Sequence, residues 1–248
     1  MSKLSAAEIH RRIASVPYWH HRIEVTPDIA TPGAYDPSDL LQRLELGDVG
    51  GKRVLDVGTR DGYFAFACER LGAEVVTIDS SPPEITGFEV ARELLGSRVD
   101  YQVGNVYDLT AAQAGTFDIV LFLGVIYHLR HPLLALDRLR DVCRGTIYVE
   151  SLVCDSSFFV DLERTEPLAT LAPSLAKLPL AQFLPYGRFH RDWTNKWVPN
   201  VACLEALLED ALFVPRACQT WGDRALLRAD VGDAEAVRVR REQDRGAG

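Results

Sequence analysis

Two groups of residues in the 248-residue sequence could do chemistry. One is the loop Gly58-Thr59-Arg60-Asp61-Gly62, which follows an apolar run, together with Asp79 at the end of the next apolar run. The other is the pair Tyr127 and His128, directly after a third apolar stretch. Backbone N–H groups at a loop and helix N-terminus bind anions, and an imidazole with a pKa of about 6.5 can accept a proton at neutral pH. A carboxylate accepts hydrogen bonds from hydroxyl groups.

The elements that must position these residues alternate between strands and helices. Apolar runs predict strands at 53–57, 74–78, 99–103, 117–122 and 145–150. Helices are expected at 63–71, from 80–84 to about 95, at 131–142 and at 201–212, with closing strands within 213–229. The alternation predicts a parallel sheet with helices on both faces. Ligands of such sheets bind at the carboxyl ends of the strands, where both groups of residues fall.

The loop differs from the G-x-G-x-x-G fingerprint of dinucleotide-binding proteins. The central glycine of that fingerprint lets the backbone approach a pyrophosphate, and Arg60 stands in its place. Asp79 comes about 20 positions after Gly58, where a carboxylate can accept hydrogen bonds from both ribose hydroxyls. The pattern therefore indicates a nucleoside ligand without a pyrophosphate and argues against NAD and FAD.

Four segments resemble the successive motifs of class I S-adenosylmethionine-dependent methyltransferases: VLDVGTRDGYF, VVTIDSS, GNVYDL and FDIVLFLGVIYHLRHP. The resemblance covers residues 45–150. It implies an α/β, Rossmann-like, doubly wound sheet of seven strands with the last strand antiparallel. GVIYHLRHP, WHHRIEVTPDIATPG and KWVPNVACLEALLEDALF are similar to the branch that contains tRNA wobble-uridine carboxymethyltransferases and small-molecule methyltransferases of similar build.

The resemblance also implies S-adenosylmethionine as cofactor, S-adenosylhomocysteine as product and a set of binding residues. Asp56, Gly58, Thr59 and Gly62 would surround the methionine part, Asp79 would hold the ribose, and Leu123 and Gly124 would offer backbone to the amino group. Ser80 and Val106 are assigned to the same site, as is Asn105 near the adenine. The family commonly has an acid at position 105, but the amide oxygen can still accept the hydrogen bond.

Arg60 has two interpretations. Its guanidinium pairs with a carboxylate of the cofactor or substrate, or it is solvated and paired with Asp61 or another surface acid. The second interpretation is favoured because long cationic side chains on loops are usually exposed.

Methyl transfer from a sulfonium needs alignment and removal of the acceptor's proton. His128, Tyr127 and His21 are the candidate catalytic residues. Alternatively, His128 orients its own turn, and His21 is a surface histidine beside a buried tryptophan. Glu150 either accepts a hydrogen bond from the substrate or pairs with an arginine.

The composition constrains the class of protein. A hydrophobic fraction of 47% supports one domain over 1–232, with a core at 45–150, a substrate cap from 1–44 and 152–200, and a loose tail at 233–248. A net charge of -8 argues against nucleic acid as a partner, and no apolar run approaches the about 18 residues of a membrane span. We expect a cytoplasmic protein with reduced cysteines and no required metal. The oligomeric state stays open, with a homodimer as one option.

Three functions follow from these observations. The favoured one is methyl transfer to a hydroxyl or amine of a small molecule, with natural product biosynthesis as a setting. The alternative is methyl or carboxymethyl transfer to a wobble uridine of tRNA. A non-catalytic cofactor-binding protein is the least favoured, because the cofactor motifs stand beside Tyr127 and His128.

Overall fold

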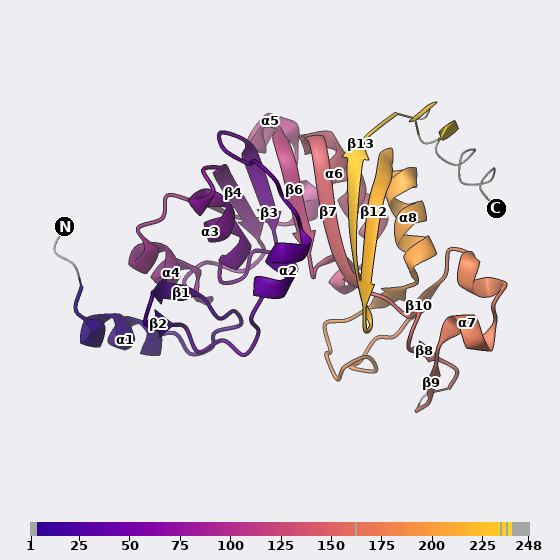
Figure 1. The fold of residues 1–248 in the computed structure, drawn as a ribbon, viewed down its shortest axis with the longest axis horizontal. Coiled ribbons are helices and arrows are strands. Elements are labelled where there is room, and N and C mark those ends of the chain that lie inside the picture. Colours follow the sequence, from indigo (N-terminus) through magenta and orange to yellow (C-terminus); the bar gives the residue numbers. More distant parts are fainter. Residues whose placement is uncertain (1–3, 162, 234, 237, 240–248) are drawn as a thin grey trace. The chain divides into compact units, whose positions relative to one another are not determined.

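The computed structural model describes residues 4–161, 163–233, 235–236 and 238–239. The chain forms two compact units, 1–108 and 109–248, and each is described by itself (Figure 1). The loose tail expected over 233–248 lies largely outside the described residues. The division into one domain with a cap stays a prediction.

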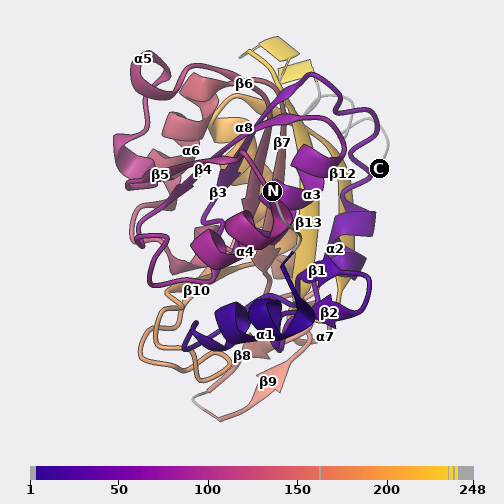
Figure 2. The same ribbon diagram turned by 90° about the vertical axis from the view of Figure 1, so that its left-hand side faces the viewer.

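The first unit contains a short parallel sheet preceded by an N-terminal segment. Its elements are α1 (Ala6–Ala14), β1 (Glu24–Thr26), β2 (Ile29–Ala30), α2 (Ser38–Arg43), β3 (Arg53–Val57), α3 (Tyr63–Arg70), β4 (Glu74–Asp79), α4 (Phe88–Leu95), β5 (Asp100–Val103) and the 3₁₀ turn η1 (Val106–Asp108). β4 pairs in parallel with β3 on one side and β5 on the other. Helices α1 and α4 pack together (Figure 2).

The core of this unit forms because the apolar residues of β3 are buried and α3 buries most of its side chains. Val54 and Leu55 are fully buried in β3. The ring of Phe66 from α3 stacks on that of Phe88 from α4, with 5.1 Å between the ring centres. This packing fixes α3 against α4, next to the loop 58–62 that joins β3 to α3.

Helix α4 begins later than the sequence predicted. The serines and prolines at 80–84 do not cap it, and the helix starts at Phe88. Thr86 Oγ1 accepts a hydrogen bond from the backbone N–H of Phe88 at 3.3 Å, and the carboxylate of Asp61 accepts one from Gly87 at 3.0 Å. These contacts satisfy N–H groups that a helix N-terminus leaves without internal partners.

The second unit contains four strands of the sheet and an insertion. Its elements are α5 (Ala111–Ala114), β6 (Phe117–Leu123), η2 (Ile126–His128), α6 (Pro132–Val142), β7 (Cys143–Leu152), β8 (Phe158–Phe159), β9 (Thr165–Glu166), α7 (Leu168–Leu171), η3 (Leu175–Lys177), β10 (Ala181–Phe183), β11 (Trp197–Pro199), α8 (Val201–Asp210), β12 (Phe213–Trp221) and β13 (Arg224–Val231). β6 and β7 are parallel, and β13 is antiparallel to both β7 and β12. Figure 1 shows α8 beside β12.

The predicted fold class is confirmed. Three strands of the first unit and four of the second make up a seven-stranded, mostly parallel sheet whose last strand, β13, is antiparallel. The insertion over 152–200 contains two small hairpins, β8–β9 and β10–β11. No helix in the described part of the chain is long and apolar enough to cross a membrane.

Candidate functional site

The loop after β3 requires both of its glycines. Gly58 and Gly62 have φ values of +75° and +91°, a region that residues with a side chain rarely adopt. A Cβ atom on Gly62 would also lie 2.5 Å from the ring of Phe66 and 2.7 Å from that of Phe88. The loop closes on itself through a hydrogen bond from the N–H of Gly62 to the carbonyl of Thr59 at 2.8 Å.

Asp56 lies beneath this loop as a buried acid. It is 3% exposed, and its carboxyl accepts a hydrogen bond from the hydroxyl of Thr59 at 2.7 Å. Burial raises the pKa of Asp56 to about 7, and the bond from Thr59 opposes that rise. The carboxyl is therefore partly protonated near neutral pH. Its assignment to the methionine part of a cofactor stays a proposal.

Asp79 ends β4 with its carboxylate partly exposed. One oxygen accepts the backbone N–H of Arg60 at 3.0 Å, and the other accepts that of Ser81 at 2.8 Å. A carboxylate oxygen has two acceptor sites, so each oxygen can accept one more hydrogen bond. The two carboxylate oxygens can therefore accept hydrogen bonds from two neighbouring hydroxyls of a ligand. Ser80, which was also predicted to bind the ligand, is exposed.

Arg60 takes the place of the missing glycine in a left-handed conformation, with φ of +53°. That conformation directs its N–H at the carboxylate of Asp79. The guanidinium lies 5.9 Å from the ring centre of Tyr18. The predicted ion pair with Asp61 is wrong, because within the described ranges no salt bridge involves Arg60 and the carboxylate of Asp61 has other partners.

Asp61 is fully buried and holds backbone from two distant segments. One oxygen accepts the N–H groups of His20 and His21 at 2.6 and 2.8 Å, and the other accepts that of Gly87 at 3.0 Å. The N-terminal segment is thereby fastened to the loop and to the start of α4. The sequence did not reveal this role, because a loop acid preceded by arginine has the local pattern of a surface pair.

His21 is buried, with 6% of its surface exposed, so its interpretation as a surface histidine is wrong. Its ring lies among those of Tyr35, Tyr63 and Phe64. Burial, then the positive charges of His20 and Arg60, lower the pKa of His21 to about 3. The ring is neutral at physiological pH, and its Nδ1 has no hydrogen-bond partner in the described part of the chain.

The predicted adenine-side residues follow β5. Asn105 is exposed and Val106 is buried. The side-chain oxygen of Asn105 accepts the N–H of Tyr107 at 3.1 Å. The amide oxygen has a second acceptor site, so it could also accept the predicted hydrogen bond from an adenine amino group.

In the second unit, β6 ends at Leu123 and is followed by Gly124, whose φ is +72°. The N–H of Gly124 donates to the carbonyl of Glu150 at 3.1 Å. The Glu150 side chain is buried and pairs with the guanidinium of Arg224 at 2.9 and 3.2 Å. Of the two roles expected for Glu150, the structure shows the pairing with an arginine. The sequence did not identify Arg224, which lies on β13.

Tyr127 belongs to the same buried group. Its hydroxyl accepts a hydrogen bond from Arg224 at 3.2 Å. Burial is the main cause that raises the pKa of Tyr127, and the charge of Arg224 opposes the rise. The phenol therefore stays protonated near neutral pH, which makes Tyr127 a poor proton acceptor.

His128 is held by a chain of hydrogen bonds that ends on an acid. Nδ1 of His128 lies 2.9 Å from the hydroxyl oxygen of Thr194, and that hydroxyl donates to Asp192 at 2.5 Å. The hydroxyl has one proton, so Nδ1 must carry the proton of the first bond. Nε2 then keeps its lone pair.

The pKa values agree with that arrangement. Burial lowers the pKa of His128, and the nearby charge of Asp192 opposes the fall, so the imidazole is neutral near pH 7. Burial of Asp192 acts to raise its pKa, but the hydrogen bonds from the hydroxyl and the backbone of Thr194 contribute to a net lowering. Asp192 is therefore ionised, and neither it nor Thr194 was predicted from the sequence.

No group of three or more histidine, cysteine, aspartate or glutamate side chains in the described ranges could hold a metal ion.

A family model described as "Methyltransferase domain" matches residues 18–210. The "Ubiquinone biosynthesis O-methyltransferase" of Xanthomonas euvesicatoria pv. vesicatoria (strain 85-10) is 32% identical over 193 residues, which cover 75% of this chain and 73% of that protein. The protein of the same name from Xanthomonas campestris pv. campestris (strain B100) is 32% identical over 142 residues, covering 56% of this chain and 55% of that protein. The chain thus spans between about half and three quarters of the length of these relatives.

Solved structures share the fold. The N-terminal domain of EvdMO1, crystallised in the presence of SAH and D-fucose, has a TM-score of 0.64 and 21% identity, covering 92% of this chain and 97% of that chain. The 1,6-didemethyltoxoflavin-N1-methyltransferase of Burkholderia thailandensis, with bound 1,6-didemethyltoxoflavin and S-adenosylhomocysteine, has a TM-score of 0.55 and 17% identity, covering 79% and 77%. At these identities the likeness establishes the architecture.

Proposed function

The chain belongs to the S-adenosylmethionine-dependent methyltransferase family, and on this premise we propose that it methylates a hydroxyl group of a small molecule. The observation that carries the proposal is the hydrogen-bond chain from Asp192 through Thr194 to His128, which leaves Nε2 able to accept a proton. A hydroxyl oxygen needs to lose its proton to become a good nucleophile, whereas an amine is already nucleophilic. The relatives named O-methyltransferases support the same choice.

The residues of the first unit fit the cofactor. Asp79 has acceptor capacity for the two ribose hydroxyls, and the glycines at 58 and 62 give the loop the positive φ values that its path requires. Asn105 and Val106 would stand at the adenine. From the second unit, Leu123 and Gly124 would offer backbone to the methionine amino group. When bound, S-adenosylmethionine supplies an activated methyl group on a sulfonium.

His128 acts as the general base for the acceptor hydroxyl. Nε2 accepts the proton that the acceptor hydroxyl loses, and the imidazolium so formed is stabilised through Thr194 by the negative charge of Asp192. Tyr127 stays protonated and, with Arg224 and Glu150, forms a fixed group beside Gly124. His21, neutral and with a pKa of about 3, contributes shape and an unpaired nitrogen and does not act as the base.

The test supplies the purified protein with donor labelled in the methyl group and three classes of acceptor: a panel of phenols and other alcohols, a matched panel of amines, and bulk tRNA. We expect label in small-molecule ethers and its loss in the His128→Gln variant. Label in tRNA would instead support the wobble-uridine alternative, and label in amines alone would contradict the role of His128. Fractionated metabolite extract then tests whether the acceptor is a specialised metabolite.

A further inference from the structure

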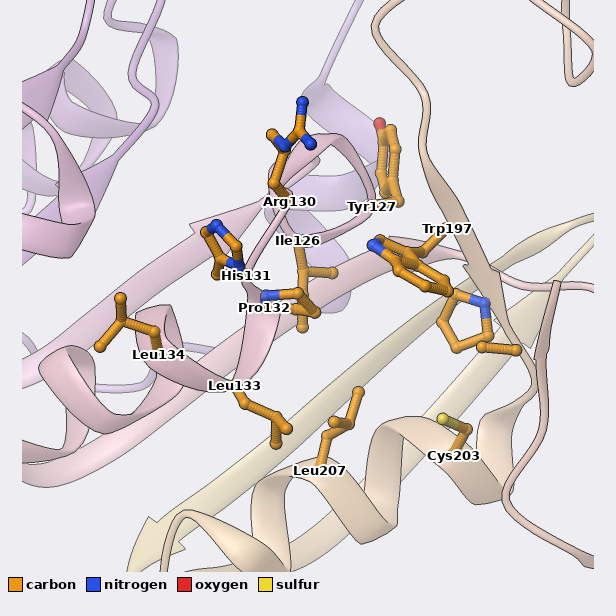
Figure 3. A pocket seen from close by; sticks show the side chains of 12 residues that line it. Ile126, Tyr127, Arg130, His131, Pro132, Leu133, Leu134, Trp197, Cys203 and Leu207 are labelled. Carbon is orange, nitrogen blue, oxygen red and sulfur yellow. The ribbon is translucent and has the colours of Figure 1, made fainter. Parts of the chain in front are cut away.

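A cavity of about 610 Å³ lies within the second unit, among η2, the start of α6, strands β10 and β11, and helix α8 (Figure 3). Its walls are mostly apolar, with Ile126 and Pro132 on one side and Leu207 on another. Small-molecule sites have volumes of roughly 300–1,000 Å³ and mainly apolar walls with a few polar groups. The cavity therefore has the size and lining of a ligand site.

Trp197 places an unpaired donor in this apolar wall. Its Nε1 is buried and has no hydrogen-bond partner in the described part of the chain. Figure 3 shows the indole in the wall, with its nitrogen toward the side where Ile126 and Pro132 lie. A buried N–H without an acceptor is unfavourable, so an oxygen atom of a bound molecule would stabilise it.

A second hollow of about 400 Å³ adjoins the cavity. The two share Arg130, His131 and Trp197, and the second hollow adds the cation of Lys196. Arg130 is exposed and forms no ion pair with any described residue, and no acid is among the described residues that line either hollow. An apolar cavity thus opens beside a smaller hollow of positive charge.

We propose that these adjoining hollows bind one amphipathic organic anion, with an alkyl or aryl group in the apolar cavity and a carboxylate at the junction. There the carboxylate would face Arg130 and Lys196 and accept a hydrogen bond from Nε1 of Trp197. The site goes beyond methyl transfer, because its argument uses neither His128 nor the residues assigned to the cofactor.

Calorimetry on the full chain tests the chemistry of the ligand with three probes. Decanoate carries both the alkyl chain and the carboxylate, decanol lacks the charge, and acetate lacks the chain. We expect decanoate to bind at least about tenfold more tightly than decanol, because hydrogen bonds to a charged group contribute on this scale. Acetate should give no measurable heat. Equal affinity for decanoate and decanol, or no binding of decanoate, would overturn the proposal.

Variants and thiol labelling test the location. Arg130→Gln should weaken the binding of decanoate about five- to tenfold and leave that of decanol unchanged. Arg138→Gln, on α6 but outside the lining of both hollows, should change neither. Trp197→Phe keeps an aromatic ring but removes Nε1, so it should also weaken the binding of decanoate. An Arg130→Gln variant that binds decanoate like the wild type would show that the anion binds elsewhere.

The thiol of Cys203 lies in the cavity wall (Figure 3). Cys218 is exposed and is not among the residues that line the cavity. Decanoate should slow modification of Cys203 by N-ethylmaleimide several-fold and leave Cys218 unchanged, as measured by mass spectrometry of the two peptides. Equal rates at Cys203 with and without decanoate would contradict the site. Because labelling needs no methyl transfer, this outcome is independent of the proposed enzymatic activity.

Discussion

Nδ1 of His128 lies 2.9 Å from the hydroxyl oxygen of Thr194. Since that hydroxyl donates its only proton to Asp192, the contact assigns the imidazole proton to Nδ1 and the lone pair to Nε2. A histidine fixed in one tautomer by a hydroxyl and an acid has the arrangement of an activated general base. The contact joins residues from η2 and from the insertion before β11.

The first prediction concerns His128 itself. General base catalysis contributes a factor of about 10² to 10⁴, so His128→Ala should lower turnover of a hydroxyl acceptor by that order and leave S-adenosylhomocysteine affinity nearly unchanged. The wild-type rate should rise with pH through an apparent pKa below the ordinary histidine value, because burial lowers the pKa of His128 and the neutral form is the active one. Near wild-type turnover in a folded His128→Ala variant would show that His128 is not the base and that methyl transfer depends on alignment alone.

The second prediction separates Thr194 from a packing role. Thr194→Val keeps the shape but removes the hydroxyl, so the tautomer of His128 is no longer fixed and turnover should fall about tenfold or more. Thr194→Ser restores the hydroxyl and should restore most of the rate. Steady-state kinetics across pH on the three proteins makes the comparison, and equal rates for Thr194→Val and the wild type would remove the hydroxyl from the mechanism.

The third prediction tests the ribose assignment. Asp79→Ala should weaken the binding of S-adenosylhomocysteine by about 1.5 to 3 kcal/mol, because hydrogen bonds to a charged group contribute on this scale. Glu84→Ala removes an exposed acid from the same unit and is the matched control. Calorimetry measures both, with NAD expected to bind neither the wild type nor the variants. Unchanged affinity in Asp79→Ala would show that the ribose is held elsewhere.

The fourth prediction follows from the raised pKa of Asp56. The folded state holds a proton up to a pH of about 7, whereas the unfolded chain releases it at a pH of about 4. The free energy of unfolding should therefore fall as pH rises through this window, by at most about 1.4 kcal/mol per pH unit, and level off above it. Asp56→Asn removes this titration, so its stability relative to the wild type should increase from pH 4 to pH 7.

Denaturant unfolding at several pH values measures this difference. Asp108→Asn is a suitable control, because Asp108 is an exposed acid in the same unit. A difference between Asp56→Asn and the wild type that stays constant with pH would contradict the raised pKa.

The parts of the fold that depend on neighbouring residues could be predicted from the sequence. The apolar run at 53–57 and the glycines at 58 and 62 define β3 and its loop because burial and positive φ act within a few residues. The partners of Asp61 lie about 40 and 26 positions away, and Thr194 is 66 positions from His128. Contacts at such separations depend on how the chain folds back and leave no local pattern.

For Arg224, the strand could be predicted from the sequence but the hydrogen-bond partner could not. Its strand was expected from apolar residues, but its bond to Glu150 spans 74 positions. The register between β13 and β7 places the two residues near each other, and register is fixed by the packed sheet and not by either strand alone. The start of α4 was missed for a related reason, since one of its caps comes from Asp61.

The fifth prediction concerns the buried carboxylate of Asp61. Asp61→Ala would leave three backbone N–H groups without their acceptor, at His20, His21 and Gly87, and should lower the free energy of unfolding by about 3 to 5 kcal/mol. Asp61→Asn keeps one acceptor oxygen and should cost less. Asp36→Ala, which removes exposed hydrogen bonds to Ser38, should cost about 1 kcal/mol or less.

Urea unfolding gives these free energies, and limited proteolysis shows where the structure loosens. Cleavage in Asp61→Ala should appear first in the N-terminal segment around residues 15–22, because that segment loses two of the three hydrogen bonds. S-adenosylhomocysteine should also bind the variant more weakly, since the loop 58–62 is no longer fastened. A variant as stable as Asp36→Ala, with no new cleavage before β1, would show that other contacts hold this segment and that Asp61 is not its anchor.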